Sequence, residues 1–169
     1  GNVRTIKRLP FEDARRQGLV IIIGEEIDRA YHASAGAVSL SSERGLKIFY
    51  SPLHGTGVTT VYPVLKGLGF DVTLCPANSN LSGAFEKVTF NIPNPEVVES
   101  FNTSLPLAQK TAADILLSTD PDADRIGVMV NHRGQWLFLT GNEIAIILTN
   151  YAITRLRAAG NTVLVVEHD

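Results

Sequence analysis

The chain has 169 residues and a formal net charge of −2, with 44% hydrophobic and 19% charged residues. These values are typical of a globular protein with room for one α/β domain and part of another. They give no basic surface for nucleic acid, and no apolar run approaches the roughly 20 residues of a membrane-spanning helix, so we expect neither partner. The single cysteine, Cys75, permits no intrachain disulfide, which favours a cytoplasmic protein with this thiol packed as a small hydrophobe.

The first half of the chain predicts a βαβ unit. A polar leading segment over residues 10–18 precedes apolar positions at helical spacing over residues 24–40. Residues 46–50 and 70–74 are short apolar strands, and residues 61–68 between them carry a helical pattern that ends near two glycines. A strand, a helix and a second strand in this order form parallel neighbours in one sheet.

The second half predicts a third strand after a long loop. The loop covers residues 75–91, and Asn94-Pro95-Glu96 then has the residue types of a helix start. Pro106 should divide the following stretch into two short helices. Residues 113–119 are apolar enough to predict a strand that is buried on both faces.

A hairpin follows, with strands at residues 126–130 and 135–139 around a turn at residues 131–134. Trp136 should pack on this hairpin. The strand at 126–130 should pair antiparallel with the strand before it. Together the elements predict an α/β fold, a three-layer α/β/α sandwich with a mixed, mostly parallel sheet.

Thr140 and Glu143 have the spacing of a capping box, so a helix should run from there to about Leu156. The last residues, from Val163 to Val166, predict the beginning of a further buried strand. Because that strand has no following partner and the chain starts without methionine, we expect a piece cut at both ends. The buried face of the helix should include Ile144, Ile147, Leu148 and Tyr151.

The most informative segment is Asp120-Pro121-Asp122-Ala123-Asp124-Arg125, directly after the third strand. In an extended backbone, which Pro121 favours, residues two apart point to the same side. Asp120, Asp122 and Asp124 should therefore converge at the carboxyl end of a buried strand, where open α/β sheets bind ligands. A solvated acidic turn is the alternative interpretation.

Three carboxylates so close together raise one another's pKa unless a cation balances their charge. Oxygen ligands select a hard ion, Mg²⁺ or Ca²⁺. An EF-hand loop starting at Asp120 would need Gly where Arg125 stands and Glu where Asn131 stands, which excludes that calcium motif. Mg²⁺ takes few protein carboxylates plus phosphate oxygens, so the loop predicts a Mg²⁺ site that receives a phosphate, with Arg125 as a charge-assisted contact.

Four segments resemble the α-D-phosphohexomutases, the family that includes phosphoglucomutases and phosphomannomutases. The acidic loop is similar to the family's metal-binding signature, and Pro93-Asn94-Pro95-Glu96 is similar to a segment upstream of it. Ser51-Pro52-Leu53-His54-Gly55-Thr56-Gly57 resembles the first strand-to-helix loop of the family's second domain. Leu139-Thr140-Gly141-Asn142-Glu143 resembles the helix start that opens the third domain. The four segments follow the family's order and spacing.

The resemblance implies an isomerase of carbohydrate metabolism with four domains around one cleft. It would transfer a phosphate reversibly between C1 and C6 of a hexose, through a phosphorylated serine and a bisphosphorylated sugar. By position, Asp120, Asp122 and Asp124 would bind Mg²⁺ together with the phosphoserine, and Arg125 would contact the phosphate. His54 would lie near the phosphoserine or the cleft between domains; a histidine that hydrogen-bonds its own loop is the alternative.

The resemblance also divides the chain. Residues 1–40 resemble the tail of domain I and a connecting helix, residues 41–139 resemble domain II with its metal-binding loop, and residues 140–169 resemble a truncated start of domain III. No phosphoserine loop of the Thr-x-Ser-His-Asn-Pro type occurs in the sequence. We therefore expect a fragment that is inactive alone, whose partners are a phosphosugar substrate and the remaining domains of its parent chain.

Other functions stay open. The Leu-His-Gly-Thr-Gly sequence is closest to a branch that includes phosphopentomutases, so a ribose phosphate is an alternative to glucose and mannose phosphates. A non-catalytic module that binds a divalent ion or a sugar phosphate, and a Ca²⁺-stabilised structural domain, are alternatives of different classes. His32, His132 and His168 lack ligand spacing and should be solvated surface residues.

Overall fold

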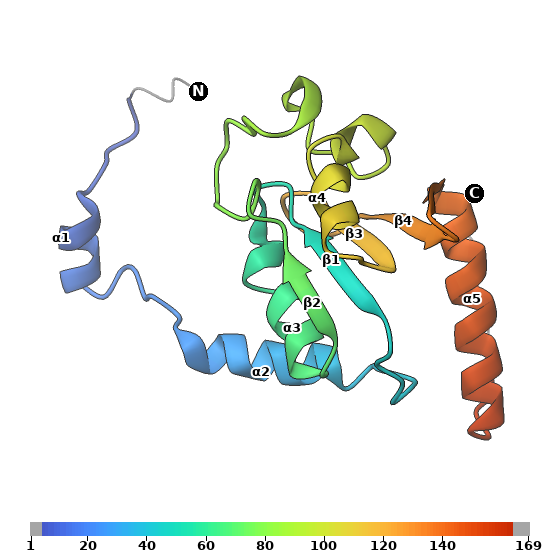
Figure 1. The fold of residues 1–169 in the computed structure, drawn as a ribbon. Helices are drawn as coiled ribbons and strands as arrows, with labels where there is room; N and C mark the ends of the chain where they lie inside the picture. Colours follow the sequence, from blue (N-terminus) through green and yellow to red (C-terminus); the bar gives the residue numbers. More distant parts are fainter. Residues whose placement is uncertain (1–4, 164–169) are drawn as a thin grey trace. The chain divides into compact units, whose positions relative to one another are not determined.

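The computed structural model describes residues 5–163, and the chain divides into two units, residues 1–31 and residues 32–169 (Figure 1). The first unit contains the helix α1 (Phe11–Arg16), which buries no residue. The predicted leading segment is therefore helical for six residues, with acidic side chains in its first turn and basic ones in its last. The helix α2 (Glu25–Gly36) lies within the stretch for which a helix was predicted.

A five-stranded sheet forms the centre of the second unit. Its strands are β1 (Lys47–Ser51), β2 (Asp71–Leu74), β3 (Ile115–Thr119), β4 (Ile126–His132) and β5 (Gln135–Leu139). Their spatial order is β2-β1-β3-β4-β5; β1 pairs in parallel with β2 and β3, whereas β4 pairs antiparallel with β3 and β5. Four of these five strands therefore run in one direction, which confirms the predicted mixed, mostly parallel sheet. The final predicted strand lies outside the described residues, apart from Val163.

Helical elements cover both faces of the sheet. The helix α3 (Val61–Gly67) packs on one face, and α4 (Leu105–Lys110) packs on the other together with the short 3-10 helix η4 (Val98–Phe101). Because successive strand residues point to opposite faces, β1 contributes to both cores. The buried residues include Ile48, Tyr50 and Val72 on the α3 face, and Phe49, Leu116 and Met129 on the α4 face. The predicted three-layer sandwich is confirmed.

The β4–β5 hairpin closes through the two-residue turn Arg133-Gly134. Both residues are left-handed, with φ of 54° and 86°, which is the backbone that a tight hairpin requires. The side-chain oxygen of Asn131 accepts a hydrogen bond from the N–H of Gly134 at 3.0 Å and so fixes the turn. Trp136 packs against the core on the α4 face, as predicted.

The prediction of a helix that starts at Asn94 is wrong. The side chain of Asn94 accepts a hydrogen bond from the N–H of Glu96 at 3.0 Å, which makes a local turn, and the helical residues begin only at Val98. Two short helical elements do precede Lys110. The break between them lies at residues 102–104 and not at Pro106, which is in the first turn of α4, where its missing N–H needs no partner.

The helix α5 (Gly141–Ala158) begins with the predicted capping box, because Thr140 and Glu143 exchange side-chain hydrogen bonds with each other's backbone N–H.

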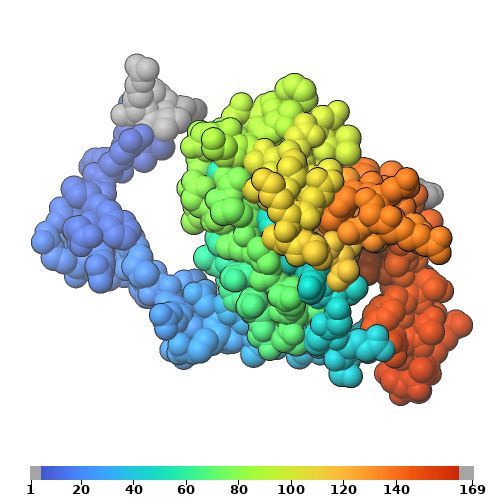
Figure 2. Space-filling view, viewed as in Figure 1, coloured from blue at the N-terminus to red at the C-terminus, as the bar shows by residue number. Residues whose placement is uncertain are grey.

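The prediction of the buried face of α5 is mostly wrong. Ile144 is buried, but Ile147 and Leu148 are more than half exposed. Tyr151 is also exposed. Ile144, in the first turn, is the one buried residue of this helix, which Figure 2 shows beside the rest of the second unit. No described helix has the length and hydropathy that a bilayer crossing requires.

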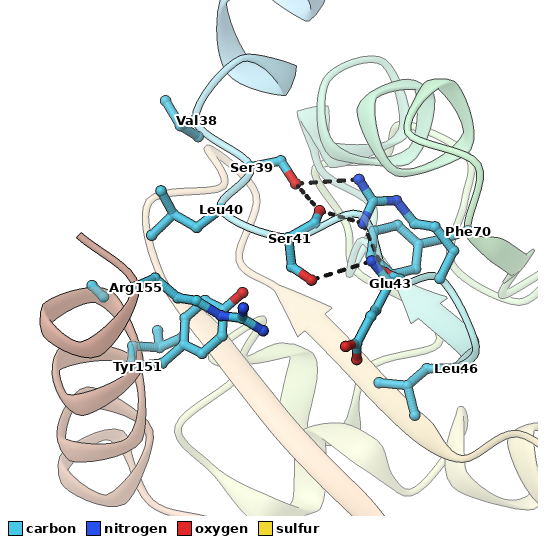
Figure 3. A pocket seen from close by; sticks show the side chains of 12 residues that line it. Val38, Ser39, Leu40, Ser41, Glu43, Leu46, Phe70, Tyr151 and Arg155 are labelled. Atoms are coloured by element: carbon cyan, nitrogen blue, oxygen red, sulfur yellow. Dashed lines mark hydrogen bonds between the residues drawn. The ribbon is translucent and has the colours of Figure 1, made fainter. Parts of the chain in front are cut away.

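A hollow of about 530 Å³ lies between residues 38–46 and α5 (Figure 3). Arg44 lines it and places its guanidinium 4.7 Å from the ring centre of Phe70. The guanidinium of Arg155 lies 5.4 Å from the ring centre of Tyr151. No residue of the acidic loop lines this hollow, so it is separate from the predicted site.

Candidate metal centre

The acidic loop leaves the sheet at the carboxyl end of β3. Since β1 and β3 are parallel neighbours, the loop after Ser51 and the loop after Thr119 emerge at the same edge. Asp120 is the first residue beyond β3 and is only 2% exposed, whereas Asp122 and Asp124 are exposed. The loop therefore holds one carboxylate inside the fold and two at its surface.

This loop is a turn and not the extended segment that the sequence predicted. The N–H of Ala123 donates a hydrogen bond to the carbonyl oxygen of Asp120 at 3.1 Å, and Ala123 is left-handed with φ of 60°. Pro121 stands at the second position of this turn, which its fixed φ suits as well as it suits an extended chain. The reversal is what lets β4 return antiparallel beside β3.

The three carboxylates nevertheless converge, because one oxygen from each lies within 4.8 Å of the other two. Mg²⁺ bonds oxygen at about 2.1 Å, so two of its ligands stand at most about 4.2 Å apart. The exposed side chains of Asp122 and Asp124 can cover the remaining fraction of an ångström by rotation. The donor set, three oxygens without nitrogen or sulfur, fits a hard divalent cation.

Arg125 holds the buried carboxylate of the cluster. Its backbone N–H donates to Oδ1 of Asp120 at 3.0 Å, and its Nε donates to Oδ2 at 3.0 Å. Burial acts to raise the pKa of Asp120, but these hydrogen bonds and those within the acidic cluster outweigh it and hold the pKa below its usual value. Asp120 therefore stays ionised, and each of its oxygens retains a lone pair for a cation.

The exposed end of the cluster is crowded with like charges. The hydrogen bond and the charge that Asp120 presents raise the pKa of Asp124, and the charge of Asp122 adds to this rise. Arg125 lies among the anions, with its Nε 3.8 Å from Asp124 and its Nη1 3.8 Å from Glu96. One arginine faces three carboxylates here, those of Asp120, Asp124 and Glu96, and a divalent cation would relieve that imbalance.

The loop after β1 packs directly on the acidic loop. Thr56 donates two hydrogen bonds to the carbonyl oxygen of Pro121, from its N–H at 2.8 Å and from its hydroxyl at 3.1 Å. A Cβ at Gly55 would stand 2.3 Å from the Cα of Pro121, and a Cβ at Gly57 would stand 1.8 Å from the hydroxyl of Tyr50. The two glycines of this segment therefore serve close backbone packing.

His54 is buried, with a side chain only 1% exposed. Its Nδ1 lies 2.9 Å from the carbonyl oxygen of Asn80, which can only accept, so Nδ1 carries the proton. Its Nε2 lies 4.0 Å from a carboxylate oxygen of Glu86 and has no hydrogen-bond partner within the described range. The ring bonds a distant loop and not its own, and it lines a hollow together with Thr56 and Pro121, on one side of the acidic loop.

The other reactive side chains lie apart from this site. Cys75 is fully buried in the core, and burial raises the pKa of its thiol, which confirms the predicted packing role. His132 is exposed, as predicted. His32 is half-buried at the surface, and its Nε2 lies 2.8 Å from the carbonyl oxygen of Thr59. His168 lies outside the described residues.

Two contacts around the acidic loop could not be read from residue spacing. The first is between the carboxylate of Glu96 and the guanidinium of Arg125. The second is between the backbones of Gly127 and Pro95, where a Cβ on Gly127 would stand 2.2 Å from the carbonyl oxygen of Pro95. Both contacts join residues about 30 positions apart, so no local pattern indicates them. The signal that existed was the joint resemblance of several segments to one family. The segments that meet are residues 51–57, 93–96 and 120–127.

Comparison with known proteins identifies the same family. The family model described as phosphoglucomutase/phosphomannomutase, alpha/beta/alpha domain II, matches residues 29–134. A phosphoglucomutase of Staphylococcus epidermidis is 29% identical over 163 residues, which cover 92% of this chain and 29% of the relative. A phosphomannomutase of Mycoplasmoides pirum is 29% identical over 145 residues, which cover 83% of this chain and 26% of the relative. A phosphoglucomutase of Staphylococcus aureus is 38% identical over 110 residues, which cover 64% of this chain and 20% of the relative.

The chain thus spans less than a third of the length of these relatives. A phosphoglucomutase/phosphomannomutase family protein from Burkholderia thailandensis has a similar fold, with a TM-score of 0.64 and 17% identity over 76% of this chain and 26% of that one. A candidate phosphomannomutase from Thermus thermophilus has a TM-score of 0.62 and 20% sequence identity, and the match covers 76% of this chain and 29% of that one. Identities this low show only the fold. Because the family model covers more than half of its residues, this chain belongs to the phosphoglucomutase/phosphomannomutase family.

Proposed function

We propose that this chain supplies the metal-binding domain of a phosphohexomutase, an isomerase that moves a phosphate between C1 and C6 of a hexose through a phosphoserine and a bisphosphorylated sugar. Residues 41–139 would be its domain II, flanked by parts of domain I in residues 1–40 and of domain III in residues 140–169. One observation carries the proposal. Three carboxylates and an arginine converge where β3 ends, in a chain whose relatives are named phosphoglucomutase and phosphomannomutase.

Asp120, Asp122 and Asp124 would hold a Mg²⁺ ion. The ion, when bound, neutralises the charge that builds up on a transferred phosphoryl group. Asp120 is fixed by its two hydrogen bonds from Arg125, so it would set the position of the site, while the two exposed carboxylates close around the ion. Three protein oxygens leave room for the phosphate oxygen that a Mg²⁺ site of this kind accepts.

Arg125 would contact the phosphate. Its Nε is engaged with Asp120, and its side chain is 46% exposed, so N–H groups of the planar guanidinium face outward for a phosphate oxygen. His54 is buried to one side of the acidic loop, and we assign it to the support of that loop in place of a contact with substrate. The phosphoserine loop and the family's sugar-binding segment of domain III are not among the 169 residues. We therefore expect no mutase turnover from this chain alone, and we place the reaction in the cytoplasm.

Binding of Mn²⁺, a spectroscopic substitute for Mg²⁺, tests the metal site. The chain should bind one Mn²⁺ in competition with Mg²⁺, and Asp122→Asn should weaken binding by about tenfold or more, because it removes a charged ligand. Asp71→Asn is the matched control, since Asp71 is an exposed aspartate at the opposite edge of the sheet. Equal affinities for the native chain and Asp122→Asn would refute the assignment of the ligands.

An assay on glucose 1-phosphate, mannose 1-phosphate and ribose 1-phosphate tests the reaction. A longer chain that adds the phosphoserine loop to these residues should turn over a hexose phosphate, and this chain alone should turn over none. Preference for ribose 1-phosphate would favour the phosphopentomutase alternative. A parent that carries no such serine loop would favour the alternative of a non-catalytic module that binds a divalent ion or a sugar phosphate. Turnover by this chain alone would contradict the proposed division of the active site.

A further inference from the structure

We infer that residues 53–56, the support loop, position the metal ligands by holding the carbonyl group of Pro121. Pro121 stands between Asp120 and Asp122, so a fixed carbonyl there fixes the peptide plane that leads into Asp122. The inference rests on the metal site proposed above and goes beyond it, because it assigns Thr56 as a positioning residue that does not touch the ion.

The contact is made by two donors on a single acceptor. The N–H and the hydroxyl of Thr56 lie 2.8 Å and 3.1 Å from the carbonyl oxygen of Pro121, and a carbonyl oxygen has two lone pairs to receive them. Gly55 brings the two backbones together, since any Cβ there would stand within 2.7 Å of three backbone atoms of Pro121. The support loop therefore holds the acidic loop at the peptide between Pro121 and Asp122, which leads from the buried carboxylate to the first exposed one.

The support loop is itself held in an uncommon backbone. Leu53 and His54 are consecutive non-glycine residues with φ of 47° and 65°, a conformation that persists only where surrounding contacts enforce it. The N–H of His54 donates to the carbonyl oxygen of Asn78 at 2.8 Å, and its ring bonds Asn80. Leu53 is completely buried. These contacts anchor the support loop in the core and make it a rigid base for the acidic loop.

Rigidity matters because the acidic loop carries several like charges. A loop free to move would spread its carboxylates apart and would have to be ordered again each time a cation bound. A loop whose Pro121 peptide is already fixed avoids most of that ordering cost. Loss of the Thr56 hydroxyl should therefore weaken cation binding although no ligand has changed.

The test compares Thr56→Val with Thr59→Val. Both threonines are exposed, and each hydroxyl donates one hydrogen bond to a carbonyl oxygen, that of Thr56 to Pro121 and that of Thr59 to Thr56 at 2.9 Å. Thr56→Val should weaken Mn²⁺ binding by about fivefold, the equivalent of one hydrogen bond. Thr59→Val should leave the affinity within about twofold while lowering the melting temperature as much as Thr56→Val does.

Two outcomes would overturn the inference, and they are distinguishable. If Thr56→Val and Thr59→Val bind Mn²⁺ equally while Asp122→Asn binds it poorly, the metal site stands and the positioning role falls. If Asp122→Asn binds Mn²⁺ as the native chain does, the proposed site itself is wrong and the inference falls with it. Gly55→Ala should weaken binding more than Thr56→Val does, provided that its melting curve shows a folded protein.

Discussion

Two opposing effects act on the ionisation of the Asp120 side chain. Burial disfavours its charge, while the hydrogen bonds from Arg125 favour the charge more strongly. Substituting Arg125 would remove the Nε hydrogen bond to Asp120 and keep the one from the backbone N–H, so a buried carboxylate would lose one of its two partners and the fold would lose stability. Substitution of Arg125 would therefore mix a loss of stability with a loss of the proposed phosphate contact. The exposed carboxylate of Asp122 gives the cleaner test of the candidate metal site.

Tyr50 provides a residue-scale prediction in the alkaline range. Its buried hydroxyl lies 2.6 Å from the hydroxyl of Thr119, and desolvation by burial raises its pKa to about 12 from 10.0. The folded state therefore favours the neutral phenol; the associated stability is complete below pH 10.0 and is lost as the pH rises toward about 12. A shift of this size corresponds to about 3 kcal/mol.

Tyr50→Phe should accordingly be less stable than the native chain by about 1 kcal/mol at neutral pH, because Thr119 loses its partner. The difference should shrink between pH 10.0 and about 12, since phenylalanine cannot ionise. Urea denaturation at several alkaline pH values measures this difference in the free energy of unfolding. Tyr62→Phe controls for the removal of a tyrosine hydroxyl elsewhere on the α3 face. A difference between Tyr50→Phe and the native chain that stays constant with pH would contradict the prediction.

At the scale of elements, the site is formed by loops that follow parallel strands. The loops after β1 and β3 emerge at one edge of the sheet because these strands are parallel neighbours, and their contact at Pro121 follows from that topology. The segment Pro93–Glu96 reaches the acidic loop from the α4 side through the close approach of Pro95 to Gly127. The acidic loop is thereby supported at both ends.

Gly127→Ala tests the second support. Its Cβ would stand 2.2 Å from the carbonyl oxygen of Pro95 and 2.9 Å from the ring of Phe101, so the backbone has to move. We expect a loss of about 1–3 kcal/mol in the free energy of unfolding, the usual cost of overpacking. Gly67→Ala is the control, since a Cβ there meets no heavy atom within 4 Å. Equal melting temperatures for the two variants would show that the Pro95 segment yields without cost.

The sequence predicted the strands, the hairpin and the acidic cluster because their signals are local. Alternating or continuous apolar residues mark each strand, and the spacing of Asp120, Asp122 and Asp124 marks the cluster. The turn at Pro121 was missed because a fixed φ suits both a turn and an extended chain. The exposed face of α5 was missed because helical periodicity shows that apolar residues share a face, but not what covers that face.

At the scale of the whole molecule, the second unit is a three-layer domain with its candidate site open at one edge. Asp122 and Asp124 are exposed, and Arg125 is partly so. A cation bound there would have protein on one side only, and its other ligands would come from solvent or from a phosphate. That geometry implies weak binding of the metal alone and stronger binding of metal with phosphate.

Thermal unfolding with paired additives tests this expectation. Mg²⁺ alone should raise the melting temperature slightly, and Mg²⁺ with inorganic phosphate should raise it by more than the two separate effects combined, because the phosphate completes the coordination. A ligand at ten times its dissociation constant stabilises by about 1.4 kcal/mol, which is roughly 3–6 °C for a chain of this size. Asp122→Asn should remove the joint effect. A Ca²⁺-stabilised structural domain would behave differently, because Ca²⁺ without phosphate would then give the largest rise in melting temperature. That result would indicate that the acidic cluster stabilises the fold and would contradict its proposed role in catalysis.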